Sequence, residues 1–337
     1  MNLIFEKLLK VHPVITVIGM AKNTGKTTTL NRLISDAGSL GRRIGIVSTG
    51  RDGEPTDVFT GREKPRIYAQ KGAYFTATEE SLGVCEAKTQ LRATTECLTS
   101  IGKVVIAEVT EPGAVEICGP GSVEETLDVV EQLREEYGVK NVLIDGSINR
   151  MAIATTRLDA GVILATGAVL GDMEQVIEQT QLKVDLLQIR CVDAQLKTVV
   201  DGHQGRAGVL LIDNELDAEV LDSSLLDHLS EVVDKITSQV SYLYSAGSVT
   251  DMVIKQLLEK GRAVEIIVED ASMVHVSGFS YEKWLASGGT ITALNKLNLL
   301  AVTCNPLNPM GNDFEPKEFL EAMRSSLNVP VYDVMIN

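Results

Sequence analysis

The stretch VITVIGMAKNTGKTTTLNRLI, residues 14–34, decides the interpretation of this chain. It begins as an apolar, β-branched run, which is typical of a buried strand, and it breaks at a glycine. After Lys26, apolar residues recur at Leu30, Leu33 and Ile34, a spacing that indicates a helix. A chain that passes from a buried strand into a helix presents backbone N–H groups where the helix dipole favours an anion. The stretch therefore predicts a phosphate site.

The loop between this strand and helix, residues 20–25 (the glycine loop), ends in residue types that suit phosphate binding. Gly25 lets the backbone approach the anion, Lys26 supplies a positive charge, and Thr27 offers a hydroxyl to magnesium. The Walker A pattern G-x-x-x-x-G-K-[ST] is missed by one residue, because Gly19 lies six positions before Gly25. The alternative is a chance glycine and lysine in a strand-to-helix turn. The other residues expected to contact the nucleotide are Gly19, Asn23, Thr24 and Thr28.

Composition limits the class of protein. A chain of 337 residues exceeds the usual size of one domain, so two domains with ample core are expected. The net charge of −15 disfavours a nucleic-acid groove. No segment has the ~18 to 20 uninterrupted apolar residues that a membrane span needs, so we expect a cytoplasmic protein without a membrane partner. The cysteines form no C-x-x-C pair, which favours reduced, buried thiols.

Apolar strands and amphipathic helices alternate along the chain. This alternation predicts an α/β protein with a parallel sheet and helices on both faces. We expect a nucleotide-binding domain over residues 1–195 and a second, smaller α/β domain over residues 206–337, which would contact a partner or a substrate. The pattern changes around QLKTVVDGHQGRAGVLLI, where strand-like pieces occur at KTVVDG (197–202) and GVLLID (208–213), so we place the boundary near residues 190–206. The second domain has no second glycine loop of this type.

Magnesium needs oxygen ligands beyond Thr27, and two apolar strands end in acids. VLIDG fits the Walker B pattern and places Asp145 at a strand tip beside the glycine loop, although an Asp-Gly pair can also simply form a turn. KVVIAEVTEP (103–112) places Glu108 near the tip of another strand. The sequence is equally compatible with a catalytic role for Glu108 and with a residue that has no role in the site.

The segment STGRDGEPTD (48–57) follows the second strand and would face the γ-phosphate in this architecture. Asp52 is the preferred residue there because its neighbouring glycines let the backbone approach the site, and a solvated surface turn is the alternative. We therefore assign catalytic roles to Lys26, Asp52 and Glu108, and metal-binding roles to Thr27, Asp145 and Asp52.

The longer loop, with five residues between its glycines, resembles that of dethiobiotin synthetase and its relatives among the P-loop NTPases. The lysine that begins their K-G-G-x-G-K motif has no counterpart, since Lys22 lies four positions before Lys26. Three motifs in order, GMAKNTGKTTTLN, VSTGRDGE and VLIDGSINR, resemble those of the P-loop reactivase subunits associated with lysine 5,6-aminomutase.

This resemblance implies a nucleotide-driven chaperone that exchanges damaged cobalamin from an adenosylcobalamin-dependent aminomutase. It implies ATP (or GTP) and Mg²⁺ as cofactors and a companion ATPase that resembles mismatch-repair MutS. The net charge argues against a nucleic-acid partner, and a homo-oligomer stays open. ATP is the default because no N-K-x-D guanine motif is evident. The competing interpretation is an ATP-dependent enzyme like dethiobiotin synthetase, acting on a small carboxylate. Both interpretations need Lys26 and Thr27.

Overall fold

The computed structural model describes residues 3–48, 65–146, 157–158, 160–203, 208–222, 224–309 and 311–336, together with the backbone of residues 51–52. The chain divides into two compact units. Unit 1 comprises Met1–Gln181 and Asn298–Asn337, and unit 2 comprises Leu182–Leu297. The second unit is thus inserted into the first, whereas a separate domain following the first was expected over residues 206–337.

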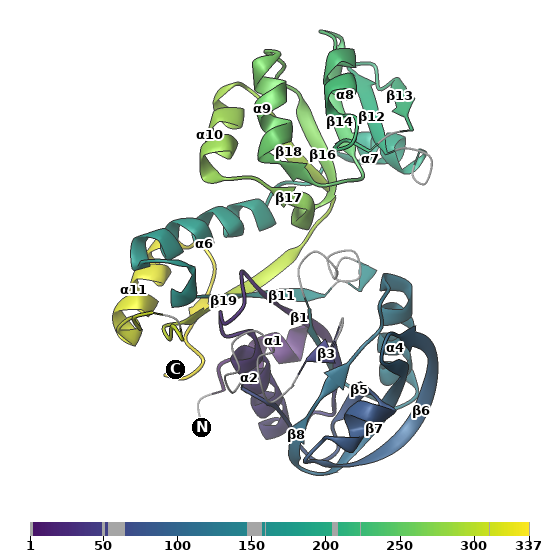
Figure 1. Ribbon diagram of the computed structural model, residues 1–337, viewed down its shortest axis with the longest axis vertical. Helices are drawn as coiled ribbons and strands as arrows, with labels where there is room; N and C mark the ends of the chain where they lie inside the picture. Colours follow the sequence, from purple (N-terminus) through teal and green to yellow (C-terminus); the bar gives the residue numbers. More distant parts are fainter. Residues whose placement is uncertain are drawn as a thin grey trace. The chain divides into compact units, whose positions relative to one another are not determined.

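Unit 1 contains a nine-stranded sheet in the order β20-β19-β11-β1-β10-β2-β5-β7-β6 (Figure 1). Neighbouring strands from β20 to β5 are parallel, whereas β7 is antiparallel to both β5 and β6. The α/β class is confirmed, but the expected parallel sheet is in fact mixed. The strands are β1 (Val14–Gly19), β2 (Ile44–Ser48), β5 (Tyr74–Thr78), β6 (Lys88–Thr99), β7 (Gly102–Glu111), β10 (Asn141–Asp145), β11 (Gly161–Gly167), β19 (Asn298–Asn305) and β20 (Val331–Tyr332).

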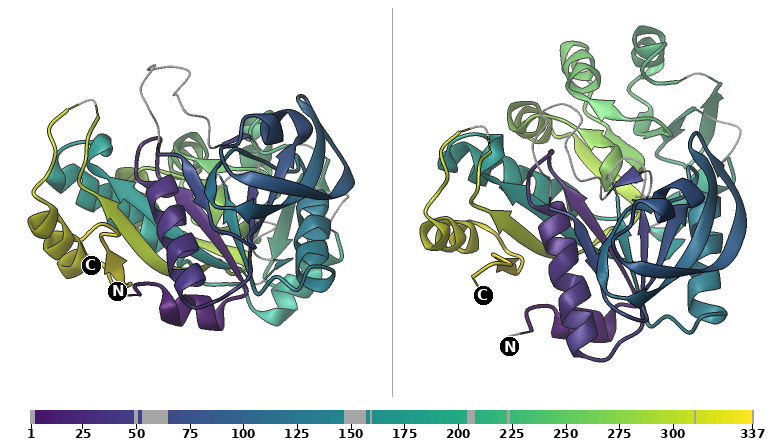
Figure 2. Two further views of the ribbon diagram at one scale, coloured as in Figure 1. Left: turned by 90° about the horizontal axis from the view of Figure 1, so that it is seen from below. Right: turned by 60° about the horizontal axis from the view of Figure 1, so that its bottom comes forward.

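Helices cover both faces of the central strands (Figures 1 and 2). Because successive side chains of a strand point to opposite faces, Ile15 of β1 packs with one apolar cluster and Val14 with another. Helix α2 (Lys26–Ser39) contributes Leu33 to the cluster of Ile15. Helix α4 (Val123–Glu135) contributes Leu133 to that of Val14. The two helices therefore lie on opposite faces of the sheet.

Shorter elements complete unit 1. Strand β3 pairs with β9, and β4 pairs with β8, both antiparallel. Helix α6 begins in unit 1 and ends in unit 2. These elements are α1 (Glu6–Val11), β3 (Arg51–Asp52), β4 (Ile67–Ala69), α3 (Glu79–Gly83), β8 (Gly113–Val115), β9 (Ile117–Cys118), η1 (Ala168–Leu170), α6 (Met173–Leu187) and α11 (Pro316–Ser326).

Unit 2 has a five-stranded sheet of its own, in the order β13-β12-β14-β16-β18. Strands β14, β16 and β18 are parallel, and β12 is antiparallel to β13 and β14. Apolar clusters lie on both faces of this sheet, and one of them contains the buried Trp284. The elements are α7 (Ala194–Asp201), β12 (Val209–Asp213), β13 (Ala218–Leu221), α8 (Leu229–Lys235), β14 (Val240–Ser245), β15 (Val249–Thr250), α9 (Asp251–Glu259), β16 (Glu265–Asp270), η2 (Ala271–Met273), β17 (Val274–His275), α10 (Gly278–Ala286) and β18 (Thr290–Asn295).

The prediction of a strand at KTVVDG is wrong, because residues 197–201 of this stretch belong to helix α7. The Asp193 side chain accepts a hydrogen bond from the backbone N–H of Leu196 at 2.8 Å, which caps the helix start. Leu196 and Val200, four positions apart, form its buried face. The capping residue and this spacing outweigh the β-branched pair that suggested a strand.

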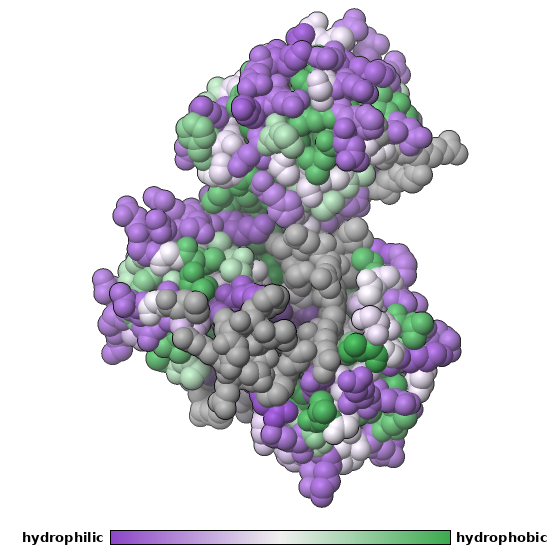
Figure 3. Space-filling view, in the orientation of Figure 1, coloured by the Kyte–Doolittle hydropathy of each residue, from purple (hydrophilic) through white to green (hydrophobic). Residues whose placement is uncertain are grey.

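Hydrophilic side chains predominate on the face of each unit that Figure 3 displays, as expected when the apolar residues fill the cores. Within the described ranges, no helix combines the length and the apolar character needed to cross a membrane.

Candidate functional site

The glycine loop joins the end of β1 at Gly19 to the start of α2 at Lys26. Gly25 occupies the N-cap position with φ 87°, in the left-handed region that glycine adopts without strain. Among the described residues, no side chain caps this helix start, and its first turn contains no acidic residue. Backbone N–H groups at the positive end of the helix dipole are therefore suited to receive an anion.

An ion pair joins the glycine loop to the neighbouring strand β10. The Lys26 Nζ lies 2.9 Å from Oδ1 of Asp145, whose side chain is 1% exposed, and the Lys26 side chain is 27% exposed. Asp145 is the last residue of β10 and pairs in register with Val17 of β1. The structure therefore brings together the two motifs that were identified separately in the sequence. A carboxylate so deeply buried needs a compensating cation, and Lys26 is one that the structure provides.

The remaining residues predicted around the loop lie in the same segment. Asn23 has φ 64°, a left-handed conformation that is uncommon outside glycine. Thr24 is buried, and its hydroxyl donates to the carbonyl oxygen of Ala21 at 2.9 Å, which tightens the loop. Thr27 and Thr28 are half-buried in the first turn of α2.

Asp52 has a described backbone only. It lies in β3 and pairs with Ile117 of β9. The residues around it, Gly50 and residues 53–57, lie outside the described ranges. Its catalytic and metal-binding roles therefore stay predictions.

Glu108 lies far from the glycine loop along the sheet. It pairs with Tyr74, the first residue of β5, and the register through β2 and β10 places this pair level with Val14, at the opposite end of β1 from Gly19. Because β7 runs antiparallel to the central strands, its carboxyl end points to the other edge of the sheet. The structure does not bring Glu108 to the loop, contrary to the sequence analysis.

Glu108 instead has local partners. It forms an ion pair with Arg92 of β6 and accepts a hydrogen bond from the Tyr74 hydroxyl at 3.2 Å. Burial and the Glu108 carboxylate together raise the pKa of Tyr74. Through these contacts, Glu108 of β7 links β7 to its two neighbours in the sheet, β6 and β5.

Two residues of β19 contact the loop and the helix after it and were not predicted from the sequence. The Asn305 Nδ2 donates to the carbonyl oxygen of Asn23 at 3.0 Å. The hydroxyls of Thr303 and Thr29 are hydrogen-bonded at 2.8 Å in a buried position. The signal that could have found Asn305 is the one that found Asp145, a polar residue at the carboxyl end of an apolar strand.

A small pocket of about 10 Å³ lies beside the loop, between α2 and the ends of β19 and β20. Its size matches a single water molecule rather than a ligand. Cys304 and Asp333 are among its lining residues. Burial, with a smaller effect of Asp333, raises the pKa of Cys304 to about 12, and burial also raises the pKa of Asp333. This corner of the site therefore disfavours negative charge on either side chain.

The predicted magnesium site has a donor set that fits that ion. Thr27 offers a hydroxyl and Asp145 a carboxylate, and Mg²⁺ prefers oxygen ligands while keeping several waters. Within the described part of the chain, no group of three or more His, Cys, Asp or Glu residues is arranged to hold a metal. Any magnesium ion here would thus depend on few protein ligands, with water and phosphate oxygens as the rest.

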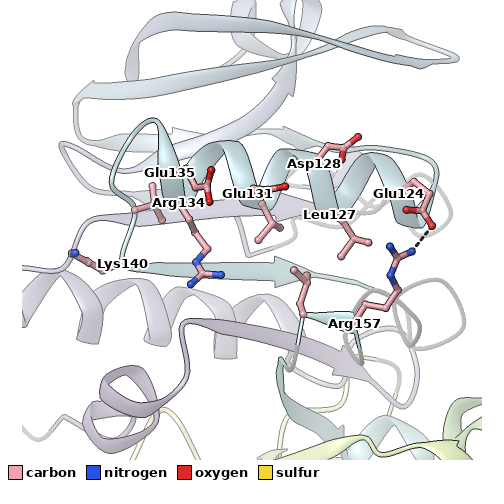
Figure 4. Close-up of a pocket in the computed structure, with 11 residues that line it drawn as sticks. Glu124, Leu127, Asp128, Glu131, Arg134, Glu135, Lys140 and Arg157 are labelled. Atoms are coloured by element: carbon pink, nitrogen blue, oxygen red, sulfur yellow. Dashed lines mark hydrogen bonds and ion pairs between the residues drawn. The ribbon is translucent and has the colours of Figure 1, made fainter.

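A cavity of about 620 Å³ lies elsewhere in unit 1, along α4 (Figure 4). Side chains of both charges surround it, and Arg157 forms an ion pair with Glu124 at its edge. Because α4 covers the face of the sheet opposite α2, this cavity is separate from the glycine loop. Its charged lining residues are Glu124, Asp128, Glu131, Arg134, Glu135, Lys140 and Arg157.

Comparison with protein families, with curated proteins and with solved structures found no match to this chain. The interpretation of the site therefore rests on its residues and their geometry.

Proposed function

We propose that unit 1 is a P-loop NTPase domain that binds a magnesium nucleotide, with ATP favoured over GTP. The Lys26–Asp145 ion pair supports this most strongly, because it joins a strand–loop–helix start suited to an anion with an acid at the tip of the adjacent strand. Lys26 and the N–H groups after Gly25 would contact the phosphates, and the Thr27 hydroxyl and Asp145 would hold the magnesium shell. Bound magnesium would neutralise charge on the phosphate oxygens.

The ion pair also suggests how nucleotide binding and magnesium binding are linked. A phosphate that draws Lys26 away leaves a carboxylate that is 1% exposed without that cation. Losing a cation from a buried carboxylate is costly, and a magnesium ion bound at Asp145 would offset that cost. We therefore expect nucleotide and magnesium to bind cooperatively, with Asp145 passing from Lys26 to the metal shell as Lys26 passes to phosphate.

We propose further that nucleotide binding and hydrolysis drive a reactivase of an adenosylcobalamin-dependent aminomutase, acting with a MutS-like companion ATPase. The support is the resemblance of the three motifs. Unit 2 would then contact the client, because it forms a sheet and cores of its own and, in its described residues, has no second glycine loop of this type. The second candidate remains an ATP-dependent enzyme like dethiobiotin synthetase, in which the same strand tips bind a small carboxylate.

Calorimetry of the full chain with Mg-ATP and Mg-GTP tests the first level of the proposal. Lys26→Ala should abolish the binding heat, and an unchanged affinity would remove the Walker A assignment. A fragment of residues 1–195 is unsuitable, because β19 and β20 complete the sheet of unit 1.

The second level is tested with an inactivated cobalamin aminomutase, the companion ATPase and the full chain. The reactivase proposal expects activity to return with ATP but not with a non-hydrolysable analogue, and not with the Lys26→Ala chain. If activity does not return, while a small carboxylate raises phosphate release many-fold, the enzyme interpretation replaces it.

A further inference from the structure

Strand β19 touches the glycine loop from a distant part of the sequence. The Asn305 Nδ2 donates to the Asn23 carbonyl oxygen at 3.0 Å and to that of Leu307 at 3.4 Å. The Oδ1 of the same side chain accepts from the backbone N–H of Leu307 at 3.3 Å. Both ends of the Asn305 amide are therefore engaged, and its orientation toward the loop is set.

The loop segment that Asn305 contacts has an unusual backbone. Asn23 and Gly25 both have positive φ, 64° and 87°. Asparagine enters this region more readily than other non-glycine residues, but the region is still uncommon for it, so contacts from the surroundings help to hold Asn23 there. The hydrogen bond from Asn305 to the Asn23 carbonyl is a contact of this kind, because it comes from outside the loop.

Two glycines also pack closely against Asn305. A Cβ added to Gly25 would lie 2.9 Å from the Asn305 Cβ, and one added to Gly167 would lie 2.8 Å from the Asn305 carbonyl oxygen. Such distances are shorter than van der Waals contact, so both glycines leave room for Asn305. Deeper in unit 1, the Thr303–Thr29 hydrogen bond joins the same strand to helix α2.

We propose that Asn305 is a positioning residue that holds the glycine loop in its anion-binding conformation, and that it thereby couples the loop to the strand through which the chain returns from unit 2. The second clause follows from the chain path, since β19 begins at Asn298, directly after the last residue of unit 2, Leu297. The other connection, α6, also reaches the base of the loop, where the Thr180 hydroxyl contacts the Met20 sulfur at 3.5 Å. The effect on nucleotide rests on the proposed function, whereas the effect on the loop does not.

Nucleotide affinity of two asparagine variants gives the first test. Asn308 is the matched control, because it belongs to the same segment and its Nδ2 also donates to a backbone carbonyl, that of Ala168 at 3.1 Å. Asn305→Ala should weaken Mg-ATP binding about 3- to 10-fold, the effect of losing one intramolecular hydrogen bond, and Asn308→Ala should leave it near the wild-type value. Thermal unfolding without nucleotide shows whether the two variants are equally folded. Equal affinity of the two variants overturns the inference.

Hydrogen exchange gives the second test and needs no nucleotide. In Asn305→Ala the backbone amides of residues 23–27 should exchange faster than in the wild type and in Asn308→Ala. If the wild-type chain binds neither Mg-ATP nor Mg-GTP, the proposed function fails, and this measurement alone decides whether Asn305 positions the loop. Unchanged exchange in this segment overturns the positioning role.

Hydrogen exchange with Mg-ATP added tests the coupling between the glycine loop and β19. Nucleotide should slow exchange in β19 of the wild-type chain, and this protection should be reduced in Asn305→Ala at saturating nucleotide. Protection of β19 that is the same in both chains would overturn the coupling.

Discussion

Replacing Lys26 should destabilise unit 1 even before nucleotide is considered. An exposed residue at a helix start could be removed without effect on folding, but the Lys26 side chain is only 27% exposed and pairs with Asp145, which is 1% exposed. Lys26→Met keeps most of the side-chain length and removes the charge, so it leaves the Asp145 carboxylate buried without this cation. Breaking a buried ion pair in this way costs about 3 to 5 kcal/mol, and we expect about 3 kcal/mol because the partial exposure of Lys26 lets water approach.

The opposite change should cost less. Asp145→Asn removes the buried charge and leaves Lys26, which can turn toward solvent, so we expect a loss of about 1 kcal/mol, comparable with one hydrogen bond. The double variant Lys26→Met/Asp145→Asn should be more stable than Lys26→Met alone, because the buried carboxylate that loses the Lys26 cation is replaced by a neutral amide. This asymmetry within the double-mutant cycle is the specific prediction.

The single tryptophan provides an internal control for the measurement. Trp284 is 0% exposed and lies in the core of unit 2, so its fluorescence during urea unfolding reports unit 2 alone. Circular dichroism reports both units. Lys26→Met should shift the part of the dichroism transition that comes from unit 1 and leave the fluorescence transition in place. If Lys26→Met is no less stable than Asp145→Asn, the reasoning from the buried carboxylate is wrong.

Three further outcomes are expected. Asp145→Asn should reduce magnesium-dependent hydrolysis far more than nucleotide binding measured without metal, and an equal loss in both assays would indicate a structural residue. Glu108→Gln should leave nucleotide hydrolysis at the wild-type rate and cost at most about 1 kcal/mol in urea unfolding, because its ion pair with Arg92 is partly exposed; a large loss of hydrolysis would return Glu108 to the site. Burial raises the pKa of the Cys304 thiol to about 12, so at pH 8 this thiol stays protonated. After treatment with iodoacetamide, mass spectrometry should find Cys304 unmodified and the exposed Cys191 modified. Rapid labelling of Cys304 would contradict its burial.

Local sequence determined the features that depend on neighbours in the chain. The apolar run before Gly19, the glycine at position 25 and the lysine after it place a loop at the start of a helix, and the apolar run before Asp145 places an acid at the end of a strand. Each pattern spans only a few residues, and buried strands and helix starts have recognisable local signals. These signals sufficed to identify both partners of the ion pair.

Tertiary structure decided which strands are neighbours and in which direction they run. Glu108 and Asp145 have similar sequence surroundings, yet β7 is antiparallel and β10 parallel to β1, so only Asp145 reaches the loop. Asn305 reaches the loop because β19 pairs with β11 after the whole of unit 2 has intervened. Strand order and direction are set by which apolar faces can be buried together over the entire domain, and residues far apart in the chain contribute to that burial. A local pattern can therefore specify a strand and the polar residue at its end, but the edge of the sheet at which that residue lies depends on pairings that the pattern does not contain.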